Sequence, residues 1–181
     1  MTVPKPNLNP QVDSVASLFI SRWDVAVMDK APEELRDQLG IAIAKQTYKA
    51  YRDLLDSSRY MRVLNAGARS QRLLWASTGT KDPKASDVLY IKSLAAPFTV
   101  NTMPEGTLKA LADHGEVGPI LQADGGDCEE VLAKFAVAGI DVEALAAQLQ
   151  DEAAQSFVKS WNELMECIAS KSAEVGRVGG S

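Results

Sequence analysis

Residues Ser14 to Asp24 read SVASLFISRWD, a short apolar run with β-branched and aromatic side chains. A run of this length and composition is typical of a strand that is buried on both faces of a parallel sheet. The segment from Arg72 to Thr80, RLLWASTGT, repeats the pattern and ends in small hydroxyl residues and a glycine. FTVNTMP, from Phe98 to Pro104, is a third short run that a proline closes. We therefore predict three strands.

Helical periodicity fills the segments between these strands. From about Ala31 to Gly67, apolar residues recur at helical spacing behind Pro32 and two glutamates, which predicts a long helix followed by a shorter one. Ser86 starts a second helical segment, and a third ends near Gly115. Strands that alternate with helices form a parallel sheet, and we expect helices to cover both of its sides. The chain beyond Gly115 is almost wholly helical, so the sheet keeps two open edges.

Composition and charge limit the class of protein. The 181 residues are 46% hydrophobic and 24% charged, which indicates one globular domain or most of one, and no stretch approaches the roughly 18 apolar residues of a membrane span. A net charge of -5 argues against nucleic acid or an anionic membrane as the main partner. The two cysteines are too few for a disulfide framework, and no signal peptide opens the sequence, so we expect a cytoplasmic protein. We assign 1–13 to an extended lead-in, 14–175 to the domain and 176–181 to a flexible tail.

Parallel α/β folds carry their chemistry where the strands end. The predicted first strand ends in Ser21 and Arg22, and the second leads through Ser77 to Lys81. An arginine and a lysine beside hydroxyl groups suit a phosphate dianion, which requires charge-assisted hydrogen bonds. The alternative is that Arg22 pairs with Asp24 or a helix end, and that Lys81 is a solvated turn residue.

Three motifs in this order resemble the sixth, seventh and eighth strand regions of transaldolase, especially the longer bacterial form that is sometimes fused to a glucose-6-phosphate isomerase. They are SVASLFISRWD, WASTGTK at Trp75–Lys81 and NTMPE at Asn101–Glu105, and the resemblance runs from about Ser14 to Ser172. It implies a class I aldolase-like (β/α)8 TIM barrel, which takes about 250 residues when complete. The expected fold class is therefore α/β: the carboxyl-terminal part of a TIM barrel, with about three parallel strands and a helix-rich C-terminal region.

The resemblance implies a transferase of the pentose phosphate pathway. In that family a lysine on the fourth strand forms a Schiff base with a ketose phosphate, such as sedoheptulose 7-phosphate or fructose 6-phosphate. A dihydroxyacetone unit then passes to an aldose phosphate, helped by an aspartate on the first strand and a glutamate on the third. The three strands predicted here match none of these, so we expect the chain alone to lack the catalytic residues and to be inactive. No cofactor or metal is implied.

The resemblance also assigns candidate residues for binding the substrate and its phosphate. Ser17 and Phe19 fall on the inward face of the sixth strand, and Arg22 at its end becomes a phosphate ligand. Ser77 matches a phosphate-side serine on the seventh strand. Many transaldolases have an arginine directly after that serine, whereas here three residues intervene before Lys81, the candidate second cation.

Two other hypotheses remain open. In one, the chain is a non-catalytic, helix-rich binding or complementing subunit that keeps the half-barrel as a scaffold. In the other, Lys81 or Lys92 replaces the missing amine, activated by burial or by neighbouring cations. Sugar phosphates are the expected ligands. Open strand edges further predict pairing with a complementing chain that carries the amino-terminal barrel strands, or self-association.

Overall fold

The computed structural model describes residues 11–178, and residues 176–178 by their backbone alone. Residues 1–10 of the predicted lead-in and 179–181 of the predicted tail lie outside the described residues. The chain divides into two compact units, Met1–Ile140 and Asp141–Ser181. In the part of the chain that is described, no helix combines the length and the apolar character that crossing a membrane requires.

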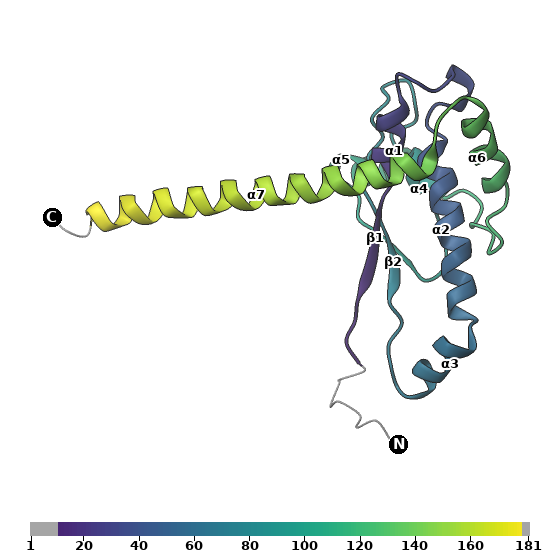
Figure 1. The fold of residues 1–181 in the computed structure, drawn as a ribbon, viewed down its shortest axis with the longest axis horizontal. Coiled ribbons are helices and arrows are strands. Elements are labelled where there is room, and N and C mark those ends of the chain that lie inside the picture. The colour runs from purple at the N-terminus through teal and green to yellow at the C-terminus, as the bar shows by residue number, and fades with distance from the viewer. Residues whose placement is uncertain (1–10, 179–181) are drawn as a thin grey trace. The chain divides into compact units, whose positions relative to one another are not determined.

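The first unit alternates strands with helices (Figure 1). Its strands are β1 (Val15–Phe19), β2 (Arg72–Ala76) and β3 (Thr99–Asn101). Its helices are α1 (Ile20–Val27), the 3-10 helix η1 (Glu33–Leu35), α2 (Leu39–Leu55), α3 (Ser58–Asn65), α4 (Leu89–Ser93), α5 (Glu105–His114) and α6 (Cys128–Val137). Helix α2 lies alongside the sheet, and α6 packs against α2.

The three strands form one parallel sheet in the order β1-β2-β3. Val15 lies opposite Arg72 and Phe19 opposite Ala76, while Trp75 pairs in turn with Asn101. The prediction of three parallel strands with helical crossovers is confirmed. Because β2 is central, β1 and β3 are the two outer strands of the described sheet.

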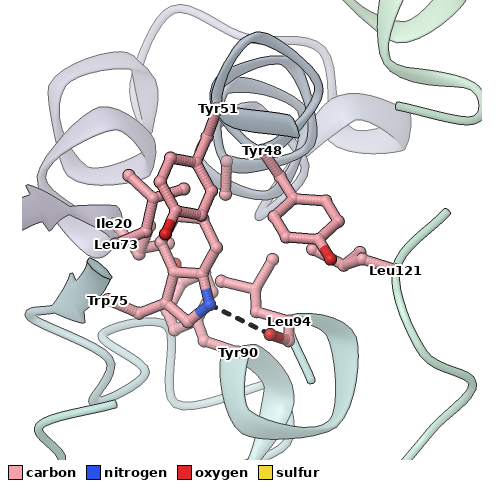
Figure 2. Close-up of a cluster of buried hydrophobic side chains, with 9 residues drawn as sticks. Ile20, Tyr48, Tyr51, Leu73, Trp75, Tyr90, Leu94 and Leu121 are labelled. Atoms are coloured by element: carbon pink, nitrogen blue, oxygen red, sulfur yellow. Dashed lines mark hydrogen bonds between the residues drawn. The ribbon is translucent and has the colours of Figure 1, made fainter. Parts of the chain in front are cut away.

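The core of the first unit lies on one face of this sheet (Figure 2). Trp75 of β2 is 1% exposed, and its indole Nε1 donates a hydrogen bond to the Leu94 carbonyl oxygen at 3.0 Å. Around it pack side chains from β2, α1, α2, α4 and the loop before α6, namely Ile20, Ala44, Tyr48, Tyr51, Leu73, Tyr90, Leu94 and Leu121. Burial of these large side chains supplies most of the stabilising free energy of the unit.

The opposite face of the sheet is open along β1. Ala16 and Leu18 pack against the core, whereas Val15 is 42% exposed, Ser17 is exposed and Phe19 is half-buried. The expectation that β1 is buried on both faces, with helices on both sides of the sheet, is therefore wrong. A single helical layer covers one face, and the inner face of a barrel sheet becomes buried only when further strands close around it.

Helix α7 (Val142–Val178) makes up the described part of the second unit. A single helix cannot bury its own apolar stripe, and Phe157, Trp161 and Leu164 are 65%, 61% and 50% exposed. The three residues follow one another at four and three positions, so they lie along one side of the helix. The helix continues through 176–178, a range that the sequence analysis assigned to the tail.

Candidate functional site

Helix α1 begins at Ile20, directly after the last residue of β1. Ser21 and Arg22 therefore lie in the first turn of a helix, and the prediction that they end the strand is wrong. The buried residues Ile20, Asp24 and Val27 follow one another at four and three positions, which is helical spacing. That change of period inside SVASLFISRWD was the signal for the helix, and the apolar run in front of it hid the signal.

The Arg22 guanidinium stacks over the ring of Phe19, with the guanidinium carbon 4.3 Å from the ring centroid. This is a cation–π contact, which orients the guanidinium but leaves its N–H groups available. Among the described residues the Arg22 side chain makes neither a hydrogen bond nor an ion pair. The alternative that Arg22 pairs with Asp24 fails, because residues two positions apart point to different sides of a helix.

Ser77 follows β2 directly and has a positive φ of 54°, which is costly for a residue with a side chain. Its hydroxyl oxygen lies 2.8 Å from that of Ser21, and its carbonyl oxygen accepts the Ser21 N–H at 3.1 Å. The predicted strand Arg72–Thr80 is thus too long, since it ends at Ala76. The turn at Ser77 joins the end of β2 to the first turn of α1, one residue from Arg22.

Thr78 connects the ends of β2 and β3. Its side chain is fully buried, and its hydroxyl donates to Oδ1 of Asn101 at 2.8 Å and lies 3.2 Å from the Thr102 carbonyl oxygen. The Thr78 hydroxyl is therefore used in hydrogen bonds within the protein. Ser77 and Thr78 have different neighbours, and only Ser77 is linked to α1.

The remaining predicted site residues lie apart from this cluster of contacts. Ser17 shares the open face of β1 with Phe19. Lys81 lies on the exposed loop after β2, and Lys92 is exposed on α4. Lys92 lines a cavity of about 620 Å³ between α2, α4 and α6, which contains none of the predicted phosphate ligands. Both lysines are exposed, so burial, one of the two kinds of activation considered for a replacement amine, is absent at both positions.

Comparison with known proteins gives the family. A family model described as transaldolase/fructose-6-phosphate aldolase matches residues 7–168. The chain belongs to this family. It is 43% identical over 164 residues to a transaldolase of Mycolicibacterium smegmatis and 44% identical over 165 residues to one of Mycobacterium bovis. Each match covers 86% of the chain and 44% of the relative, so the chain spans less than half the length of these curated transaldolases.

Sequence reasoning did not find the polar contacts behind the transaldolase-like site. Asp24 is 4% exposed, and its carboxylate accepts hydrogen bonds from the Gly40 N–H at 3.1 Å and the Tyr90 hydroxyl at 2.7 Å. Burial raises the pKa of Asp24 to about 6, against the lowering effect of these two hydrogen bonds. Burial, with the neighbouring Asp24 charge, also raises the pKa of Tyr90. A donor 66 positions away has no signal in the local sequence.

The chemistry open to Arg22 and the first turn of α1 is anion binding. Arg22 offers a planar fork of donors, and the first turn of α1 adds the positive end of a helix dipole. Within residues 11–178 no group of three or more histidine, cysteine, aspartate or glutamate side chains is arranged to hold a metal ion. A phosphate group is the anion that this pair of features fits.

Proposed function

We propose that this chain supplies the phosphate-binding side of a transaldolase site, and that polypeptide beyond these 181 residues supplies the Schiff-base lysine. The observation that carries the proposal is the Arg22 guanidinium, held over Phe19 at the end of β1 with no ion pair among the described residues. A partly buried arginine without a counter-ion is ready for an anionic ligand. Membership of the transaldolase/fructose-6-phosphate aldolase family makes a sugar phosphate the expected one.

In this proposal each residue has a limited role. Arg22 donates two hydrogen bonds to the phosphate, the Ser77 hydroxyl lies beside it, and Ser17 and Phe19 line the inner face along which the sugar extends. Lys81 is a second cation that approaches from the loop after β2. Transfer of the dihydroxyacetone unit then takes place on the complementing strands, as a cytoplasmic step of the pentose phosphate pathway. The open edge of β1 is the place where we propose that those strands pair.

Binding of fructose 6-phosphate tests the role of Arg22. We expect calorimetry to detect binding to the wild-type chain and Arg22→Ala to weaken it at least about tenfold, because a charge-assisted hydrogen bond contributes about 1.5–3 kcal/mol. Arg59→Ala is the matched control, since Arg59 is exposed on α3 and should bind like the wild type. Undetectable heat from the wild type and from Arg22→Ala alike would favour the non-catalytic scaffold instead.

Turnover tests whether phosphate binding and the Schiff-base lysine are supplied by different polypeptide segments. The chain alone is expected to show no transfer from fructose 6-phosphate to erythrose 4-phosphate. Addition of a polypeptide carrying the amino-terminal strands of the Mycolicibacterium smegmatis relative should restore transfer with the wild-type chain and far less with Arg22→Ala. Turnover by the chain alone would contradict the proposal, and borohydride trapping followed by peptide mapping would then show whether Lys81 or Lys92 is the reacting amine.

A further inference from the structure

The direction in which Arg22 points depends on how α1 is held. Helix α1 has eight residues and no side chain hydrogen-bonded at its N-cap, Phe19. A helix this short has little stability of its own, so its neighbours determine where it lies and how it is rotated about its axis. The contacts between Ser21 and Ser77 fix the first turn of α1. The second turn needs contacts of its own.

Asp24 provides the contacts of the second turn. Its Oδ1 accepts the N–H of Gly40, which lies in the first turn of α2, and its Oδ2 accepts the hydroxyl proton of Tyr90 on α4. The side chain of Gln38, the N-cap of α2, donates to the Glu34 carbonyl oxygen and does not cap the first turn of α2, so Asp24 satisfies an amide that the helix leaves free. One carboxylate thereby ties α1 to two other helices.

The approach of α1 to α2 at this point is close. A Cβ atom on Gly40 would lie 2.6 Å from Asp24 Oδ2 and 2.7 Å from the Ile20 carbonyl oxygen. Both distances are shorter than real Cβ atoms tolerate, so glycine is needed at this position. The backbone of α1 and the carboxylate it carries are therefore seated directly on the start of α2, with little room to rotate.

Asp24 and Arg22 lie on different sides of α1, two positions apart. When Asp24 faces α2 and α4, Arg22 faces the open side of the sheet, where it meets Phe19. Rotation of α1 would carry the guanidinium away from that ring. An apolar residue at 24 would avoid the cost of burying a carboxylate, but it would not impose two hydrogen bonds in fixed directions.

We infer that Asp24 is a positioning residue for Arg22: through Gly40 and Tyr90 it fixes the rotation of α1 that places the guanidinium over Phe19. The inference rests on the proposed function for what Arg22 binds. The way in which Arg22 is held follows from the contacts of α1 and does not depend on the proposed function. A carboxylate that never touches the substrate thereby sets the geometry of the phosphate ligand.

The test is the NMR signal of the Arg22 Nε–Hε group in the full chain, which the Phe19 ring current displaces from its ordinary position. Asp24→Asn and Tyr90→Phe are expected to move this signal toward the value of an unstacked arginine and to weaken fructose 6-phosphate binding by about tenfold. Tyr90→Phe removes one hydroxyl and provides the measurement if Asp24→Asn does not fold. Tyr48→Phe is the control, because it deletes another buried hydroxyl of the same core without touching Asp24.

The outcomes separate this inference from the proposed function. An Arg22 signal and an affinity that stay at wild-type values in folded Asp24→Asn and Tyr90→Phe would overturn the positioning role and reduce Asp24 to a structural contact. If Arg22→Ala leaves fructose 6-phosphate binding unchanged, the proposed phosphate ligand is wrong. The displacement of the Arg22 signal by Asp24→Asn would still support the positioning role in that case.

Discussion

Trp75→Ala is expected to destabilise the first unit by about 4 kcal/mol, the range measured when a buried tryptophan is removed from a core. Trp75 is 1% exposed on the central strand and lies among Tyr48, Tyr90 and Leu94 in Figure 2. The substitution leaves a large cavity and also takes the hydrogen-bond donor away from the Leu94 carbonyl oxygen. A loss of this size removes a large share of the roughly 5–15 kcal/mol that stabilises a typical domain, so the unfolded fraction should rise strongly.

Urea denaturation followed by circular dichroism checks this expectation, because the method does not depend on tryptophan as a fluorophore. Trp161→Ala is the matched control. Trp161 is 61% exposed on α7, so its removal should change the free energy of unfolding by no more than about 0.5 kcal/mol. Equal shifts of the midpoint for both variants would mean that the side chain of Trp75 is not the centre of the core.

The strands could be predicted because short apolar runs with β-branched and aromatic residues favour strands. VASLF and RLLWA are runs of apolar residues, and the structure pairs them in register from Val15 opposite Arg72 to Phe19 opposite Ala76. The ends of the strands were misjudged because apolar character continues past them. Ile20 is as apolar as Phe19, but it is fully buried as the first residue of a helix. Composition alone does not show where the strand ends, and the helical spacing of Ile20, Asp24 and Val27, which does show it, is hidden by the apolar run in front of it.

For the candidate site, the sequence predicted which residues take part but not which residues they contact. Arg22 and Ser77 were both identified, but their connection runs through Ser21, which is 56 positions away from Ser77 along the chain. Asp24 was weighed only as a partner for Arg22, whereas its real partners are on α2 and α4. Contacts of this kind follow from how the helices pack on the sheet, and a sequence pattern with a period of two or of 3.6 residues does not reveal them.

The buried carboxylate of Asp24 also predicts how stability depends on pH. Its pKa rises from 3.8 to about 6 on folding, chiefly because burial disfavours the charged form. Between those values the folded chain holds a proton that the unfolded chain has lost. The stabilising contribution is therefore complete below about pH 4 and is lost as the pH rises through about 6. A shift of this size corresponds to about 3 kcal/mol.

Comparison of the wild type with Asp24→Asn isolates this contribution, since asparagine keeps the shape of the side chain but does not titrate. The free energy of unfolding of the wild type, measured with urea from pH 4 to pH 7, is expected to fall by up to about 3 kcal/mol relative to that of the variant. Subtracting one curve from the other cancels the contribution of the other groups that titrate in this range. Asp37 is one of them, since burial raises its pKa as well. Parallel curves would show that Asp24 keeps its charge throughout. The two hydrogen bonds from Gly40 and Tyr90 would then outweigh the cost of burying the carboxylate. The orientation of α1, and with it the position of Arg22, would not vary across this pH range.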